Sequence, residues 1–459
     1  MATPLWGKLG DLFGHKYTFM ASIVLFLLGS ALCGMSEDML QLIGFRAFQG
    51  LGAGGLMVGI MSVIGMLVSP RDRGKYQGVM MAVMPAAMIG GPLVGGYITD
   101  NMSWRWVFYV NLPLGLLSLA VVWFTLNLTH EKRHRDDVVI DWWGAGLLSV
   151  WITSLVLAIT WGGTQYAWGS WQILGLGAVA AVGLVAFVRV ERDAREPIMP
   201  LRLFGSMNFT LTAVLGFVAG FAMFGGMTFL PQYQQFVQGQ SATNSGLLLT
   251  PMMISAMVLS LGGGLVISRT GHYKAFPIAG TALLVVGLWL FSRMDLDTTT
   301  TQTAIAMVVM GAGMGCLMQT TNLIAQNSIA ITDIGAGTGA VTFLRNMGGS
   351  LGVAALGAIY TNQLTSTLAQ AGVGSSGAGA GAATAGGMIP EVLRSMPAAV
   401  RHLFQQAVVN GTSAIFFWGA VVGVVGFVLA WGITQVPLRA TVVPQPSRPL
   451  ERVEETAAV

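Results

Sequence analysis

Long apolar runs alternate with short polar connectors along most of the chain. A helix needs about 20 apolar residues to cross the hydrocarbon core of a bilayer, so each run of this length predicts one membrane span. The pattern indicates an all-α, polytopic membrane protein with twelve spans, near residues 17–36, 39–69, 75–99, 104–127, 140–162, 171–189, 207–231, 245–268, 275–293, 303–328, 334–361 and 411–434.

The composition agrees with a membrane location. Of the 459 residues, 54% are hydrophobic and 9% are charged, whereas a soluble globular domain carries about 25% charged residues. A water-soluble or disordered chain is therefore excluded. Cys33 and Cys316 lie inside apolar runs and are interpreted as small buried residues. The net charge of +4 is spread along the chain and indicates no nucleic-acid partner.

The basic residues predict the direction of the chain in the membrane. If the amino terminus is cytoplasmic, seventeen of the 23 Lys and Arg residues lie in cytoplasmic segments and four in outer segments. Arg46 and Arg345 lie within spans. Because Lys and Arg are retained on the cytoplasmic side during insertion, we expect both termini in the cytoplasm.

A short glycine-rich segment occurs twice, once in each half of the chain. Its residues share a single offset of 257 positions in the pairs Gly7/Gly264, Asp11/Ser268, Gly14/Gly271 and His15/His272. Ordinary basic connectors would explain either copy alone, but four matched positions favour a repeat. Repeated halves are typical of secondary transporters, which move one helix bundle against the other.

With the repeat, several motifs resemble the major facilitator superfamily. The segment from Gly7 to Lys16 resembles the family's signature between spans 2 and 3. Four further motifs carry the resemblance: Arg46-x-x-Gln49-Gly50-x-Gly52, Gly91-Pro92-x-x-Gly95-Gly96, Trp104-Arg105-Trp106-x-Phe108-x-x-Asn111-x-Pro113 and Leu230-Pro231-x-Tyr233-x-Gln235. The last two are similar to motifs of the EmrB/QacA-type drug:proton antiporters. This branch has 14 spans, which implies two six-helix bundles and two extra central helices.

The distance between the repeated segments agrees with that branch. Eight runs separate them, where the 12-span layout would place six, so runs 140–162 and 171–189 are interpreted as the extra pair. The first run would then be the family's span 3, and we expect that spans 1 and 2 are missing through truncation or a wrongly chosen start Met.

The predicted divisions are an amino-terminal bundle at 1–130, extra spans at 131–205, a carboxy-terminal bundle at 206–436 with an outer loop at 362–410, and a disordered cytoplasmic tail at 437–459.

The first repeated segment is the candidate gating loop, comprising Gly7, Asp11, Gly14, His15 and Lys16. The Asp11 carboxylate can accept hydrogen bonds from a helix amino terminus or pair with basic residues such as Arg71 and Arg73. Asp11 would then hold the cytoplasmic gate closed in one state. A solvated turn is the alternative interpretation.

Arg46 is the candidate for proton coupling. A guanidinium within a span needs a partner, and it lowers the pKa of a nearby carboxylate. The resemblance implies that this partner is a proton-carrying carboxylate on span 1. None of the 19 acidic residues lies near a span centre, so this carboxylate would be missing with span 1. The alternative is that Arg46 extends to the outer membrane interface.

The candidate antiporter motif comprises Gly91, Pro92, Gly95 and Gly96. Proline kinks a helix, and a Gly-x-x-x-Gly ridge lets a second backbone approach closely. A tight helix contact here would block leakage through the bundle.

A polar stripe at helical spacing is the candidate substrate site. Gln319, Asn322 and Gln326 would share one helix face, which avoids lipid and faces either a cavity or a neighbouring helix. Phe221, Phe224 and Gln235 could add aromatic and amide groups to a cavity for bulky apolar, often cationic compounds. Arg345 is a second embedded charge whose partner the sequence does not identify.

Two enzyme-like motifs are rejected. Gly50-x-Gly52-x-x-Gly55 follows no strand, so close helix packing is the better interpretation than a dinucleotide site. The sequence from His130 to His134 matches a zinc-protease pattern but adjoins Arg135 and has no evident third ligand. We therefore expect no enzymatic activity, no metal and no cofactor.

The leading hypothesis is export of amphipathic drugs or toxic compounds from a bacterial cytoplasm, driven by protons entering across the cytoplasmic membrane. A dedicated metabolite exporter and a truncated, non-transporting remnant are the alternatives, and a membrane-embedded enzyme is the weakest. Some members of the branch use a periplasmic adaptor protein, and the sequence leaves open whether this chain needs one.

Overall fold

The computed structural model describes residues 2–69, 101–126, 141–370 except 164, 195 and 241, and 397–438, together with scattered positions between 72 and 99. Its named elements are all helices. The predicted all-α fold class is confirmed.

Ten helical segments within the described residues are long and apolar enough to cross a membrane. They are α2 (His15–Met35), α3 (Met39–Leu67), α5 and α6 together (Trp106–Thr125), α7 (Trp142–Trp161), α8 (Trp171–Asp193), α9 (Met207–Phe236), the end of α10 with α11 (Asn244–Thr270), α12 (Ala275–Ser292), α13 (Thr300–Asn327) and α17 (Ala398–Trp431). Each coincides with one of the twelve predicted runs.

The two remaining runs differ from these ten. Run 334–361 forms α14 (Ile334–Gln370), a helix of 37 residues that carries Arg345 and many glycines and threonines. At 1.5 Å per residue it is about 55 Å long, more than enough to cross a bilayer. Run 75–99 lies largely outside the described residues, so its span stays a prediction.

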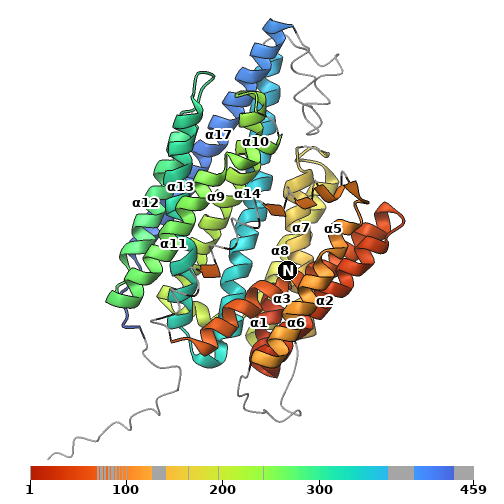
Figure 1. Cartoon of the computed structure of the whole chain (residues 1–459), viewed down its shortest axis with the longest axis vertical. Coiled ribbons are helices and arrows are strands. Elements are labelled where there is room, and N and C mark those ends of the chain that lie inside the picture. Colours follow the sequence, from red (N-terminus) through yellow and green to blue (C-terminus); the bar gives the residue numbers. More distant parts are fainter. Residues whose placement is uncertain are drawn as a thin grey trace, which may run out of the picture.

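The helices form two groups that meet at one end of the molecule (Figure 1). One group contains α9, α11, α12, α13, α14 and α17, and buried side chains from these helices form its largest apolar core. The other contains α2, α3, α5 and α6, together with α1 (Thr3–Phe13).

The helix pair α7 and α8 packs against the carboxy-terminal group. Leu148 and Trp151 of α7 and Phe187 of α8 share a buried cluster with Phe209 of α9 and Val341 of α14. Helices α7 and α8 therefore share a core with helices that follow them in the chain. The predicted domain boundaries at residues 131 and 205 remain untested.

The segment predicted as a gating loop is helical, which corrects the interpretation of Gly7 to Lys16. Gly7 and Asp11 lie on α1, and α2 begins at His15. Only Gly14 leaves the helical conformation, with φ 92° and ψ 134°, where L-residues are strongly disfavoured. The sharp turn at Gly14 lets α1 and α2 follow one another directly.

Glycines allow α1 to cross closely over the start of α14. A Cβ atom on Gly7 would overlap the carbonyl group of Gly335, and one on Gly339 would press on the backbone of Thr3 and Pro4. This α1–α14 crossing joins the two helix groups and positions the candidate site.

Candidate functional site

Asp11 binds the amino terminus of α14 across the crossing. Its Oδ1 accepts a hydrogen bond from the backbone N–H of Gly335 at 2.8 Å, and its Oδ2 accepts one from Ala336 at 2.7 Å. The first N–H groups of a helix have no partner within the helix and carry partial positive charge. A carboxylate at this position satisfies two of them, as the helix-terminus interpretation predicted.

The environment of Asp11 opposes and supports its charge at the same time. Burial raises the pKa of Asp11, while the hydrogen bond and charge of His15 and the two backbone N–H groups lower it, with burial the largest effect. His15 Nε2 lies 3.3 Å from Asp11 Oδ1, and both side chains are buried. Arg71 and Arg73, the expected partners, lie outside the described residues.

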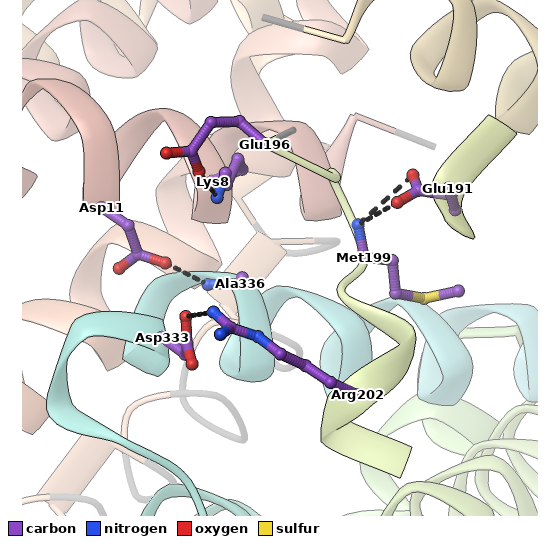
Figure 2. Close-up of polar contacts among 8 residues, drawn as sticks. All are labelled: Lys8, Asp11, Glu191, Glu196, Met199, Arg202, Asp333 and Ala336. Atoms are coloured by element: carbon purple, nitrogen blue, oxygen red, sulfur yellow. Dashed lines mark hydrogen bonds and ion pairs between the residues drawn. The ribbon is translucent and has the colours of Figure 1, made fainter. Parts of the chain in front are cut away.

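The linker between α8 and α9 contacts both sides of the crossing (Figure 2). Lys8 of α1 pairs with Glu196 of the linker at 2.5 Å. Six residues further on, Arg202 pairs at 2.9 Å with Asp333, directly before α14. One short segment, residues 194–206, therefore makes ion pairs with both helix groups.

The linker is fixed to α8 by a buried carboxylate. Glu191, only 3% exposed, accepts hydrogen bonds from the backbone N–H of Met199, with both oxygens at 3.4 Å. Figure 2 shows Glu191, Met199 and Arg202 following one another towards Asp333. Glu191 thus holds the linker in the path that presents its two charged residues.

The second repeated segment makes a different and exposed contact. Ser268, the counterpart of Asp11, donates a hydrogen bond to Asp72 at 3.3 Å in an exposed position. Gly271 also has positive φ, at 72°, and ends α11. Both copies of the segment therefore end a helix at a glycine with positive φ.

Arg46 occupies an exposed position on α3. Its Nη1 donates to Gln49 Oε1 at 3.0 Å, and its guanidinium lies 5.8 Å from the ring centre of Phe108. Within the described residues no ion pair to Arg46 is formed. Its role in proton coupling stays a prediction.

The antiporter motif is only partly described. Gly91 and Gly95 are helical, whereas Pro92 and Gly96 lie outside the described residues. A Cβ atom on Gly91 or Gly95 would meet no atom within 4 Å. The structure therefore does not test the predicted tight contact. The rejected motif from Gly50 to Gly55, by contrast, packs as predicted, since Gly52 lies against the backbone of Phe26.

The polar stripe of α13 is buried among helices. Gln319, Asn322 and Gln326 are each no more than 2% exposed. Gln326 Nε2 donates to Thr338 Oγ1 of α14 at 3.1 Å and to the carbonyl oxygen of Met61 of α3 at 3.4 Å. Gln326 thus joins the two helix groups, which matches the neighbouring-helix alternative.

The three other cavity candidates separate into two places. Phe221 and Phe224 pack on α14, where Gly352 and Gly349 make room for them. Gln235 lies further along α9, about 20 Å from Phe221 at 1.5 Å per residue, and donates to Ser245 at 2.9 Å. Gln235 therefore does not join the two phenylalanines.

Arg345 is buried on α14, with 3% of its surface exposed. Its Nη2 donates to Thr321 Oγ1 of α13 at 3.3 Å, and its Nε is buried without a hydrogen-bond partner among the described residues. Arg345 is therefore buried among helices, and its position within a membrane span stays a prediction.

Sequence reasoning missed the ionic contacts of the linker. Lys8, Glu196, Arg202 and Asp333 lie far apart in the chain and belong to no shared motif. The glycines at Gly335, Gly337 and Gly339 were the available signal, because they mark a close approach at the start of α14. They do not reveal which charges surround it.

Long apolar helices that form two groups define a multi-pass membrane protein. The sequence profile of the Major Facilitator Superfamily matches residues 1–353, well over half of the chain. The chain therefore belongs to the Major Facilitator Superfamily.

Known relatives include transporters of two bacteria. An uncharacterised MFS-type transporter of Mycobacterium tuberculosis (strain H37Rv) is 42% identical over 439 residues, 94% of this chain and 62% of that protein. Multidrug resistance protein 3 of Bacillus subtilis (strain 168) is 37% identical over 410 residues, 89% of this chain and 78% of that protein. The chain thus spans less than two thirds of the mycobacterial relative.

A solved structure shares the fold. The human organic anion transporter MFSD10 (TETRAN) superposes with a TM-score of 0.58 at 13% identity, over 92% of this chain and 80% of that one. At this identity the likeness concerns the fold alone.

Proposed function

We propose that this protein exports amphipathic compounds from the cytoplasm in exchange for protons, by alternating access. The sequence relation to Multidrug resistance protein 3 supports export of such compounds. The two helix groups would rock against each other around a central substrate site.

The observation that carries this proposal is the contact between Asp11 and the start of α14. The carboxylate joins two helix groups through a pair of charge-assisted hydrogen bonds, at 2.8 and 2.7 Å. Such bonds can form and break as a unit when the groups separate. The structure then corresponds to a state closed at the α1–α14 crossing, which we assign to the cytoplasmic side.

We further assign α7 and α8 to the extra helix pair of the 14-span drug:proton antiporter branch. Their position between two groups that carry the repeated segments supports this assignment. It implies a bacterial cytoplasmic membrane with both termini in the cytoplasm. Arg46 would tune the proton-carrying carboxylate of that branch.

The test is accumulation of a panel of fluorescent cationic, neutral and anionic amphipathic compounds in bacteria that lack their own drug pumps. Cells that produce the protein should accumulate at least one compound several-fold less than control cells. A protonophore should abolish the difference, because the proton gradient supplies the energy. An Asp11→Asn variant at equal membrane abundance should behave like control cells.

The outcomes separate the alternatives. Unchanged accumulation of every compound would contradict multidrug export and favour a dedicated metabolite exporter or a non-transporting protein. Export that survives the protonophore while ATP is maintained would contradict proton exchange.

A further inference from the structure

Arg345 lies inside the carboxy-terminal helix group. It is about 16 Å along α14 from Ile334 at 1.5 Å per residue, so it lies well inside the helix and away from its amino terminus. Its side chain is 3% exposed, and its backbone carbonyl touches α9 at Gly220. The guanidinium is therefore enclosed by the surrounding helices.

The charge of Arg345 has no counter-charge in its helix group. The sequences of α9, α11, α12, α13, α14 and α17 contain no Asp or Glu at all. Among the described residues the guanidinium makes a single hydrogen bond, to Thr321, and its Nε has none. A buried charge without a partner is strongly destabilising, so such residues in membrane helices usually mark a ligand or ion path.

The free donors of Arg345 suit one kind of group. A guanidinium presents five N–H donors in a planar fork that matches the two oxygens of a carboxylate. Thr321 accepts one proton from Nη2 at 3.3 Å, which leaves the Nε proton, the second Nη2 proton and both Nη1 protons for a further acceptor. A carboxylate bound there would supply both the missing charge and the missing hydrogen bonds.

Aromatic side chains lie on the helix that packs against Arg345. Phe217 and Phe221 of α9 have ring centres 6.5 Å apart. A Cβ on Gly348 would overlap the backbone of Phe217, and one on Gly352 would press on Phe221, so these glycines let α9 approach α14 closely at the two phenylalanines. The helix that packs directly against α14 around Arg345 therefore carries apolar aromatic residues.

We propose that Arg345 binds the carboxylate of an amphipathic monocarboxylic acid, and that such acids are substrates of this transporter. The proposal rests on the proposed export function and names its substrate class. It reverses the preference for cationic compounds expected from the sequence.

The test measures binding to the purified protein in lipid nanodiscs with three probes that share one ring system. The probes are 1-pyrenebutanoate, neutral 1-pyrenebutanol and cationic 1-pyrenebutylamine. The wild type should bind the butanoate about tenfold more tightly than the other two, as a charge-assisted bidentate pair provides. The Arg345→Gln variant should lose this preference and bind the alcohol unchanged.

Two further variants make the result decisive. Arg345→Lys retains the buried charge but lacks the planar fork, so it should keep only part of the preference. Arg401→Gln changes an exposed arginine of α17 and should bind all three probes like the wild type. If Arg345→Gln does not fold, an unchanged butanoate preference in Arg345→Lys overturns the proposal.

Equal binding of the three probes by the wild type, or a butanoate preference that survives in Arg345→Gln, would also overturn it. Binding in nanodiscs needs no proton gradient. A retained butanoate preference without export from cells would therefore contradict the proposed export function and leave the carboxylate-binding role of Arg345 standing.

Discussion

The two copies of the repeated segment both end a helix at a glycine with positive φ but differ in the contact they make. Gly14 and Gly271 both have positive φ, at 92° and 72°. Beside the first turn, Asp11 places a carboxylate on the amino terminus of α14. Near Gly271, the Ser268 hydroxyl group donates a hydrogen bond to Asp72 at 3.3 Å. The positive-φ glycine is shared, and the carboxylate is not.

The histidines that follow the turns show the same difference. His15 is buried and lies 3.3 Å from Asp11, whereas His272 is exposed and contacts the carbonyl oxygen of Thr270, two residues away. The first segment places a buried carboxylate on a helix terminus. The second makes exposed contacts, through Ser268 to Asp72 and through the carbonyl oxygen of Gly271, which accepts from Gln435. We infer that the Asp11 side of the repeat dominates the stability of the closed state.

The largest expected effect comes from removing the charge of Asp11. Asp11→Asn keeps the shape of the side chain but replaces two charge-assisted bonds, each worth about 1.5–3 kcal/mol, with at most one neutral bond. The amide protons of Gly335 and Ala336 should exchange with deuterium more than tenfold faster, as a loss of more than 1.4 kcal/mol of local stability implies. Hydrogen–deuterium exchange mass spectrometry of the α14 start measures this.

The matched control is Ser268→Ala in the second copy. An exposed hydroxyl contact contributes within about 0.5 kcal/mol, so exchange at the start of α14 should stay at the wild-type rate. Equal acceleration in both variants would contradict the asymmetry between the two segments.

Features that depend on residues close in sequence could be predicted here, whereas contacts between residues far apart in the chain could not. The repeat, the long apolar helices and the helix-terminus role of Asp11 follow from local spacing and residue chemistry. The identity of α14 as the acceptor could not be predicted, because 324 residues separate Asp11 from Gly335. Only the packing of the two helix groups decides which amino terminus Asp11 meets.

The predicted loop from Gly7 to Lys16 shows a second limit. Its glycines suggest a loop when read by local preference, yet Gly7 is helical because α14 passes directly over it. A glycine required for a close approach and a glycine required for a turn look alike in one sequence. Gly14 is the turn, and its φ of 92° distinguishes it.

The linker gives a second, smaller difference between the two sides of the crossing. The pair Lys8–Glu196 is largely buried, with side chains 9% and 21% exposed, whereas Arg202 in the pair with Asp333 is 71% exposed. A double-mutant cycle with Lys8→Ala and Glu196→Ala should give a coupling of about 1–2 kcal/mol. The cycle for Arg202 and Asp333 should give less than about 1 kcal/mol, because solvent screens an exposed pair.

Thermal unfolding of the purified protein in one detergent provides both couplings. The exchanged pair Lys8→Glu with Glu196→Lys is the control and should recover part of the stability lost in each single variant. A larger coupling energy for Arg202 and Asp333 than for Lys8 and Glu196 would contradict the expectation that the more buried ion pair is the stronger one.

The smallest expected difference concerns the two turns themselves. Gly14 has φ 92° and ψ 134°, outside the left-handed helical region, while Gly271 lies near it with φ 72° and ψ −2°. Gly14→Ala should lower stability by about 2 kcal/mol and Gly271→Ala by about 1 kcal/mol. Asn tolerates the left-handed helical region, so Gly271→Asn should recover most of the loss and Gly14→Asn should not. Thermal unfolding of the four variants measures these stabilities. If Gly14→Asn recovers all of the stability lost in Gly14→Ala, the two turns are energetically alike despite their different backbone angles.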